Sequence, residues 1–187
     1  MTVNRCEWAN ASALEAQYHD EEWGMPLHDD RLLFESLILE SAQSGLSWAT
    51  ILRKREGYRQ AFDHFDVQKV SKYSEEKIQT LLQNPAIVRN KLKVNATVIN
   101  AQRIIAIQAE YGSFNQYIWS FVSGKPINKQ WEALSDVPAT TAESEAMSKA
   151  LKQKGFKFIG PTTCYAFMQA IGMVNDHVVS CFRHSEC

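Results

Sequence analysis

The amino-acid sequence predicts an all-α protein, and three observations support this. Apolar residues recur every three or four positions, as in Val94, Val98, Ala101 and Ile105, which is the period of a helix with one buried face. The alternating runs of β-branched residues that are typical of strands are missing. Residues that cap or end helices also stand at suitable intervals. We therefore expect helices joined by turns.

The helices expected in chain order cover residues 30–44, 48–56, 74–83, 91–111, 114–122, 143–154 and 161–172. Capping residues mark the starts and glycines mark the ends, with Asp29, Asp30, Ser47 and Pro161 at starts and Gly45, Gly112 and Gly172 at ends. Residues 123–142 contain Gly124, Pro126 and Pro138 and are expected to form a loop that connects two helical halves.

Length and composition predict one globular domain spanning residues 1–187. A chain of 187 residues with 45% hydrophobic content can bury one sizeable core. The sequence has no run of about eighteen apolar residues and no apolar leader after Met1. We therefore expect a cytoplasmic protein with no membrane partner. We also expect a monomer. The net charge of −1 neither requires nor excludes nucleic acid, whose binding would depend on local patches.

Two Cys/His pairs stand at opposite ends of the chain: Cys6 with His19, and His177 with Cys181. The spacing His-Val-Val-Ser-Cys predicts that the second pair lies one helical turn apart on one face. Cysteines of a cytoplasmic protein are expected to be reduced and available to a metal. Two thiolates and two imidazoles complete a tetrahedral zinc shell, so we expect one structural Zn²⁺ that joins the N-terminal and C-terminal segments.

A rival ligand set at the C-terminus uses the spacing Cys181-x2-His184-x2-Cys187. It would leave Cys6 and His19 without a purpose. We therefore favour the shell formed by the two ends of the chain.

Glu40 occupies an unusual position for a carboxylate. It follows Leu33 and Leu37 on the apolar face of a predicted helix, close to the helix C-terminus, where the helix dipole disfavours negative charge. The alternative is an exposed glutamate at a fraying helix end. Because Gly45 allows a sharp turn and Trp48 begins the next helix, Glu40 and Trp48 can face one cleft.

Aromatic residues adjoin the predicted ligands. Trp8 is near Cys6, while Tyr18 and Trp23 flank His19. Filling the core is the more common role of such side chains. Tyr18 and Trp48 together with the Glu40 carboxylate would, however, form a box for a flat cation.

The segment from Lys154 to Gly172 places Gly155 and Gly160 around apolar residues, and Pro161 then begins a helix. Glycines allow a phosphate to approach the backbone, and a helix N-terminus offers free N–H groups. This arrangement resembles the helix-hairpin-helix element of DNA repair glycosylases. The neighbouring lysines, which include Lys157, would add positive charge, although they could equally form an ordinary solvated face.

Five motifs in order along the chain resemble the DNA-3-methyladenine glycosylase I family. They are Arg5-Cys6-x-Trp8, Tyr18-His-Asp-x-Glu-Trp-Gly24, Leu39-Glu-x-x-Gln-x-Gly-Leu-Ser-Trp48, Gly155-Phe-Lys-Phe-Ile-Gly-Pro-Thr162 and Val174-Asn-Asp-His-Val-Val-x-Cys181. The resemblance implies a helix-hairpin-helix glycosylase fold, a structural zinc at the two Cys/His pairs, and excision of 3-methyladenine from alkylated double-stranded DNA. It places Glu40, Tyr18 and Trp48 in the base pocket, with Trp8 and Trp23 beside it.

The chemistry expected of such a site is modest, because a methyl group on N3 makes the base cationic and a good leaving group. Trp48 would stack on the flipped base and Glu40, the candidate catalytic residue, would offset its charge. Superfamily relatives place an aspartate where this chain has Asn175, and we expect Asp176 to support His177 or cap a helix. Relatives with lyase activity use a lysine where this chain has Thr162. We therefore expect a monofunctional enzyme that leaves an abasic site.

Five residues are expected to contact DNA. Gln43 and Leu46 could fill the hole left by the flipped base, although ordinary turn packing explains them nearly as well. Lys157, Gly160 and Thr162 would contact the backbone. The alternative functions are a zinc hydrolase, which needs an open metal position, and a zinc-stapled DNA-binding module without catalysis, for which a buried Glu40 has no evident purpose.

Overall fold

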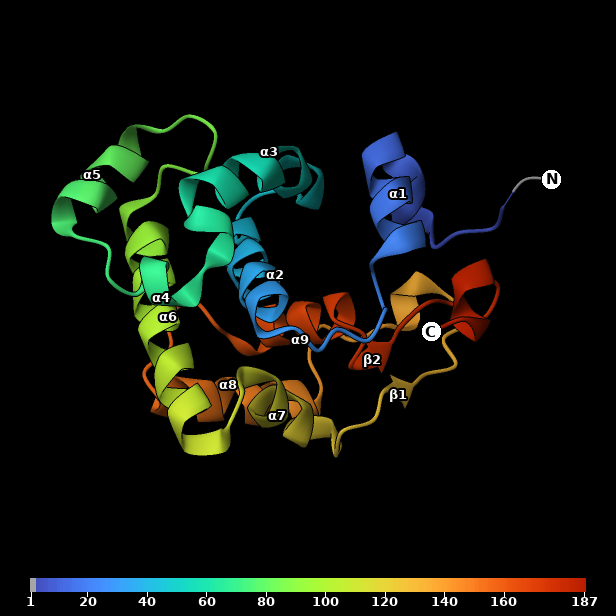
Figure 1. The fold of residues 1–187 in the computed structure, drawn as a ribbon. Helices are drawn as coiled ribbons and strands as arrows, with labels where there is room; N and C mark the ends of the chain where they lie inside the picture. Colours follow the sequence, from blue (N-terminus) through green and yellow to red (C-terminus); the bar gives the residue numbers. More distant parts are fainter. Residues whose placement is uncertain (1–2) are drawn as a thin grey trace.

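Helices dominate the computed structural model (Figure 1), which describes residues 3–187. Met1 and Thr2, the first two residues of the N-terminal segment in which no apolar leader was predicted, lie outside the described residues. The α-helices are α1 (Ala13–Glu21), α2 (Asp30–Gln43), α3 (Trp48–Ala61), α4 (Val67–Val70), α5 (Glu75–Gln83), α6 (Lys91–Tyr111), α7 (Phe114–Trp119), α8 (Ala142–Gln153) and α9 (Pro161–Ala170). No helix among the described residues is long and apolar enough to cross a membrane.

The predicted all-α class is confirmed, and each predicted helix has a counterpart. The predicted helix 48–56 ends too early, because α3 continues through Gly57 to Ala61. A Cβ at Gly57 would lie 2.6 Å from the carbonyl oxygen of Ala86. This glycine therefore permits close packing within a helix rather than ending one.

Two helices were not predicted. The short α4 is capped by Asp66, which accepts from the backbone N–H groups of Gln68 and Lys69. The longer α1 begins at Ser12, whose hydroxyl oxygen accepts from the N–H of Glu15. Few of its side chains are buried, so apolar periodicity gave no signal for it.

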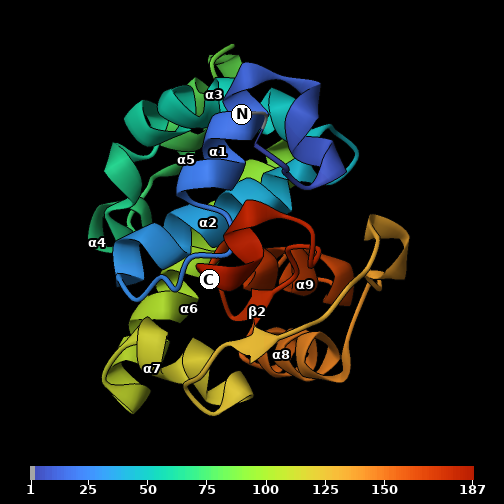
Figure 2. The same ribbon diagram turned by 90° about the vertical axis from the view of Figure 1, so that its right-hand side faces the viewer.

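A small parallel sheet links the connecting loop to the segment after α9. Strand β1 (Ile127–Asn128) pairs with β2 (Val174–Asn175), with Ile127 opposite Val174. The loop then runs along the C-terminal segment (Figure 2). The sheet therefore fixes the loop close to the predicted ligands His177 and Cys181.

Helix α2 lies at the centre of the molecule. It packs against α3, α6, α7 and α9, and its side chains from Leu37 to Ala42 are all buried. Because such a helix has no solvated face along this stretch, Glu40 is buried with the leucines. The fold therefore places a carboxylate inside the protein near the end of its central helix.

The hairpin, residues 154–160, joins α8 to α9. Its Ile159 is buried and its carbonyl oxygen accepts from the hydroxyl of Ser148 on α8 at 2.7 Å. Gly155 has a φ of +89°, a conformation that favours glycine. The predicted helix-hairpin-helix element is thus present, with Lys157 and Phe158 on its exposed side.

Candidate functional site

The predicted ligands from both ends of the chain meet in one buried cluster. Their donor atoms, the two sulfurs of Cys6 and Cys181 and one ring nitrogen each of His19 and His177, lie within 4.8 Å of one another. Nδ1 of His177 lies 3.2 Å from Nε2 of His19 and 3.6 Å from each sulfur. The Cys181 sulfur lies 3.4 Å from Nε2 of His19.

These separations match a tetrahedral metal shell. Zinc bonds of about 2.3 Å to sulfur and 2.0 Å to nitrogen place neighbouring ligand atoms roughly 3.3–3.8 Å apart. The chemistry of the donors also fits, because the cluster offers two cysteine sulfurs and two imidazole nitrogens from buried residues, which are the ligands of structural zinc sites. The four residues could therefore hold one metal ion.

Neighbouring groups hold both imidazoles in the orientation that a metal requires. Nδ1 of His19 lies 2.8 Å from the Asp20 carboxylate, which Arg5 binds in a bidentate ion pair. That guanidinium is the main cause of the lowered pKa of Asp20. Nε2 of His177 lies 3.1 Å from the carbonyl oxygen of Trp23. This leaves Nε2 of His19 and Nδ1 of His177 facing the centre of the cluster.

The prediction that His177 and Cys181 share a helix face is wrong. Residues 176–181 follow β2 as an irregular segment with a turn. The N–H of Cys181 donates to the carbonyl oxygen of Val178 at 2.8 Å, and the N–H of His177 donates to Oδ1 of Asn175. Because the chain folds back within this short segment, the two ligands meet without a helix.

The rival ligand set is not assembled. Nε2 of His184 lies 2.9 Å from the carbonyl oxygen of Lys129, and the sulfur of Cys187 lies 3.9 Å from that of Met25. Within residues 3–187, neither belongs to the group of potential metal ligands. Cys181 therefore belongs to the shell with Cys6 and His19.

A cavity of about 290 Å³ lies beside the ligand cluster. This is near the lower end of the size range of small-molecule sites. Its lining comes from the N-terminal segment before α1, from α1 and the turn after it, from α2, α3 and α9, and from the connecting loop and the segment after β2. The lining residues are Trp8, Glu15, Tyr18, Trp23, Glu40, Gln43, Trp48, Leu134, Val137, Ala166, Gln169 and Asp176. The structure therefore brings together Glu40, the predicted aromatic residues and Gln43.

Aromatic contacts join the cavity wall to the ligand cluster. The Trp23 ring packs edge-on against His177 with ring centroids 4.6 Å apart, and against Trp8 at 5.2 Å. Across the cavity wall, the ring centroids of Tyr18 and Trp48 are 5.2 Å apart. The ligand cluster thus fixes part of the wall directly, through rings that touch its imidazoles.

The Glu40 carboxylate and the Trp48 indole face this cavity without a hydrogen-bond partner in the described part of the chain. Glu40 is 7% exposed, and no donor among the described residues hydrogen-bonds its carboxylate. Burial raises the pKa of Glu40 to about 8, since no cation offsets the lost hydration. The indole N–H of Trp48 is also buried without a partner in the described structure. An acceptor and a donor are therefore left for a ligand.

The charge of the lining favours a cation. The three acidic lining residues are Glu15, Glu40 and Asp176, and the described lining contains no lysine or arginine. The Glu40 charge also contributes, after burial, to the raised pKa of Tyr18. A flat cation would meet aromatic faces and negative charge at once.

The remaining predicted contacts lie outside the cavity. Leu46 is 40% exposed in a turn where its N–H donates to the carbonyl oxygen of Gln43. Lys157 and Thr162 are exposed, and Gly160 is the N-cap of α9. They form two separate surface elements, the turn after α2 and the hairpin with the start of α9.

Comparisons with known proteins agree with this arrangement. A family model described as methyladenine glycosylase matches residues 8–184. The chain is 46% identical to DNA-3-methyladenine glycosylase 1 of Escherichia coli, over 96% of each chain. It is also 46% identical to DNA-3-methyladenine glycosylase of Haemophilus influenzae, over 96% of this chain and 97% of that one.

Solved structures show the same likeness. A crystal structure of 3-methyladenine DNA glycosylase I superposes with a TM-score of 0.93 at 46% identity, covering 96% of this chain and 98% of that one. A Staphylococcus aureus structure described as the basis of 3-methyladenine recognition gives 0.93 at 40% identity, with 97% of both chains covered. The chain belongs to the methyladenine glycosylase family.

One expectation about this methyladenine glycosylase is wrong. Asp176 neither supports His177 nor caps a helix, but lines the cavity and is 2% exposed. Its carboxylate accepts from the indole N–H of Trp131 at 2.8 Å, from Nε2 of Gln169 at 2.9 Å and from the Tyr165 hydroxyl. Three donors from the connecting loop and α9 thus hold the Asp176 carboxylate at the cavity wall, and no hydrogen bond among the described residues joins it to the His177 imidazole.

Several residues of the methyladenine glycosylase site were missed. Asp20 takes the supporting role beside His19, and its position next to a predicted ligand was the available signal. Glu15 and Gln169 line the cavity from α1 and α9. Trp131 lies in the connecting loop, where nothing in the sequence indicates a contact with the site.

Proposed function

We propose that this chain removes 3-methyladenine from alkylated double-stranded DNA and leaves an abasic site. The observation that carries the proposal is the buried, unpartnered Glu40 carboxylate in a cavity lined by aromatic rings and acids. The proteins that the chain matches, at 46% identity over nearly its whole length, are named for activity on this base. Glu40, Tyr18 and Trp48 are proposed as the residues that recognise the flipped base.

The base is selected by its charge. Methylation at N3 makes the nucleotide cationic, whereas unmodified adenine is neutral. Stacking on Trp48 then gains a cation–π contribution of about 0.5–2 kcal/mol that adenine lacks. The Glu40 carboxylate accepts from the exocyclic amine and offsets the charge, and Tyr18, Trp8 and Trp23 limit the shape of the site.

The reaction needs little acid catalysis. Water adds its oxygen to C1′ of the sugar while the bond from C1′ to the base breaks. The bonding electrons neutralise the cationic base, which leaves uncharged, and the proton of the water passes to solvent. Thr162 replaces the lysine of relatives with lyase activity, so we propose hydrolysis without cleavage of the DNA strand.

The metal is proposed to be one structural zinc held by Cys6, His19, His177 and Cys181. When bound, it would cross-link the two ends of the chain. With four protein ligands the shell has no position for a water, which argues against a zinc hydrolase. The unpartnered Glu40 carboxylate argues against a DNA-binding module without catalysis. Burying a carboxylate without a partner lowers the stability of the fold, and such a module has no ligand for it to bind.

Two surface elements are proposed to hold DNA. In the wedge turn, residues 43–47, Gln43 reaches the cavity and Leu46 is exposed, so both are suited to fill the space of the flipped base. In the hairpin and the start of α9, Lys157, Gly160 and Thr162 would contact the phosphate backbone. A monomeric state and a cytoplasmic location stay predictions.

Base release from methylated duplex DNA tests the proposal. The released bases are separated by chromatography that resolves 3-methyladenine from 7-methylguanine. We expect 3-methyladenine alone. Release of neither base would refute the function, and equal release of both would refute selection by charge and shape.

A further inference from the structure

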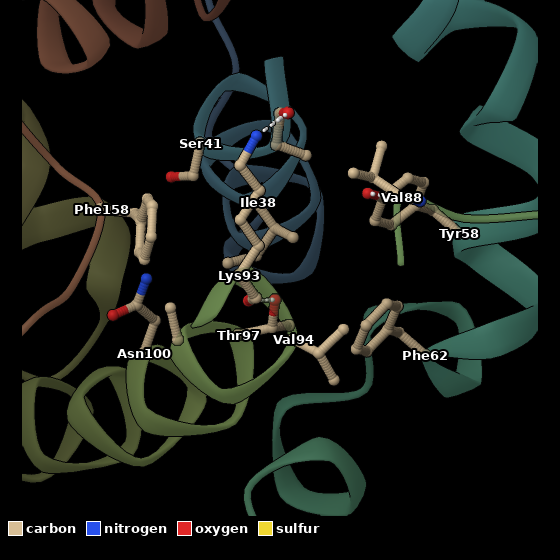
Figure 3. Close-up of a pocket in the computed structure, with 12 residues that line it drawn as sticks. Ile38, Ser41, Tyr58, Phe62, Val88, Lys93, Val94, Thr97, Asn100 and Phe158 are labelled. Atoms are coloured by element: carbon tan, nitrogen blue, oxygen red, sulfur yellow. Dashed lines mark hydrogen bonds between the residues drawn. The ribbon is translucent and has the colours of Figure 1, made fainter. Parts of the chain in front are cut away.

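Helix α6 contacts both surface elements that the proposed function assigns to DNA. Lys93 in its first turn reaches the wedge turn, and Asn100, two turns later, reaches the hairpin (Figure 3). Both side chains, with Phe158 of the hairpin, line the same small cavity of about 10 Å³. One rigid helix therefore bridges two elements that are far apart in the sequence.

Lys93 holds the end of the helix that carries Glu40. Its ammonium donates to the carbonyl oxygens of Ala42 at 2.9 Å and Ser44 at 2.6 Å, the residues on either side of Gln43. Carbonyls at a helix C-terminus lack intrahelical partners and carry the negative end of the dipole, so a cation stabilises them. The same cation lies in the first turn of α6, where that helix's own dipole disfavours it. The position of the Lys93 ammonium therefore stabilises the C-terminal end of α2 rather than the start of α6.

Asn100 holds the hairpin by its backbone. It is fully buried, and its amide donates to the carbonyl oxygen of Lys157 at 3.0 Å and accepts from the N–H of Lys157 at 2.8 Å. Both backbone groups of Lys157 are thereby satisfied by one side chain. The next residue, Phe158, has a φ of +56°, an uncommon conformation for a bulky residue. The fixed backbone of Lys157 helps to maintain it.

The two contacts lie on one face of α6. Asn100 lies seven positions after Lys93, which is about two turns and 10 Å along the axis. Between them lies the buried Thr97, whose hydroxyl donates to the carbonyl oxygen of Lys93 at 3.0 Å. The spacing of the wedge turn and the hairpin is thus set by a helix of fixed rise.

We propose that Lys93 and Asn100 are positioning residues that hold the wedge turn and the hairpin at the separation needed to grip one DNA duplex while a base is flipped. The proposal rests on the proposed function. Neither side chain touches the base cavity, so both act through the elements they hold. Lys93 is accordingly no phosphate contact, although its charge and its place near the helix start would suggest one.

The test uses four variants and three measurements, and one of the variants, Lys93→Arg, keeps a positive charge at the position of Lys93. Lys93→Met keeps the stem of the side chain and removes the donor, Asn100→Asp keeps the acceptor and removes the donor to Lys157, and Lys91→Met removes the same charge from the same turn of α6. For each, we measure single-turnover base release from methylated duplex DNA at saturating enzyme, binding of free 3-methyladenine, and the salt dependence of binding to a duplex with an abasic-site analogue.

We expect Lys93→Met and Asn100→Asp to lower the single-turnover rate about 10- to 100-fold, as small misplacements far from the chemistry can do, while free 3-methyladenine binds as in the unaltered chain. Lys93→Met should keep the salt dependence of DNA binding, Lys91→Met should keep the rate, and Lys93→Arg should restore much of it.

The inference would be overturned by an unchanged rate for Lys93→Met and Asn100→Asp, by an equal loss of rate for Lys91→Met, or by a salt slope for Lys93→Met that is shallower by about one phosphate contact. Loss of free-base binding in these variants would also contradict it, because the cavity would then be what is damaged. Failure of the unaltered chain to release any base would instead refute the proposed function.

Discussion

The indole N–H of Trp131 donates to the Asp176 carboxylate at 2.8 Å, and this bond fastens the connecting loop to the wall of the base cavity. Leu134 and Val137, a few residues further along the loop, line that cavity. The carbonyl oxygen of Trp131 also accepts from the N–H of Val179, beside the metal ligands. The loop between the helical halves is thus part of the site.

Replacing Asp176 by Asn should loosen this loop. Asn offers fewer acceptor positions than the three donors require, and leaving a buried donor unpaired costs about 1–3 kcal/mol. We expect faster hydrogen exchange in residues 131–137 and slower base release. Trp131→Phe should have a similar effect, and the two losses should not add, because both variants break one contact.

Asp136→Asn is the matched control for this loop. Among residues 3–187, the Asp136 carboxylate accepts only from the N–H of Ala133 and does not line the cavity. If it accelerates exchange and slows base release as much as Asp176→Asn does, the Trp131 contact has no special role.

Activity should depend on the protonation of Glu40. Because burial raises its pKa to about 8 in the free protein, most of the carboxyl is protonated at pH 7, and a cationic base must displace that proton. We expect kcat/KM to rise with pH, with its midpoint near pH 8, and to level off about one pH unit higher, since this ratio reports the pKa of the free enzyme. The rising limb should vanish in Glu40→Gln. A flat profile for the unaltered chain would contradict the assignment.

The raised pKa of Glu40 also affects the stability of the fold, which falls over the pH range in which activity rises. A carboxyl whose pKa is higher folded than unfolded binds more protons when folded, so its contribution falls as the pH rises from about 4.5 to 8. We expect Glu40→Gln to be more stable than the unaltered chain at pH 9, by roughly 2–4 kcal/mol, and nearly equal to it at pH 4. Thermal unfolding at both pH values checks this, and an equal difference at both would exclude Glu40 as the titrating group.

Removing the proposed zinc should weaken the junction of the two chain ends. A ligand present at 1,000 times its Kd stabilises a folded protein by about 4 kcal/mol. We expect a chelator to lower the Tm and Cys181→Ser to lower both the Tm and the bound zinc, measured by atomic absorption. Cys187→Ser, outside the cluster, should retain its zinc. Equal zinc content in both variants would contradict the ligand assignment.

Sequence reasoning was most successful where one local pattern determines one structure. The helical period predicted both ends of α6 correctly. The Cys/His pairs predicted a cluster that joins Cys6 to His177, which are 171 positions apart in the chain. Helix α1 was missed because it buries few side chains, although Ser12 and Glu15 form a recognisable start signal. Local pattern is thus reliable when it coincides with burial.

The rest depends on tertiary contacts that no local pattern contains. The end of α3 was misplaced because Gly57 accommodates a neighbouring backbone. The role of Asp176 was mistaken because its partners come from Trp131 in the loop and from α9. Alignment by motif placed Asn175 toward the site, whereas its amide binds the carbonyl oxygens of His184 and Cys187. The partners of Gly57 and Asp176 include residues remote in sequence, whereas those of Asn175 are near in the chain but are reached only because the C-terminal segment folds back.

Recognition of the cationic base by Glu40 is tested by comparing base release from methylated duplex DNA by the unaltered chain, Glu40→Gln and Glu76→Gln, which alters an exposed glutamate on α5. Removing a hydrogen bond to a charged group costs about 1.5–3 kcal/mol, so Glu40→Gln should release 3-methyladenine roughly 10- to 100-fold more slowly, while Glu76→Gln matches the unaltered chain. Unchanged release of 3-methyladenine by Glu40→Gln would show that Glu40 does not recognise the base.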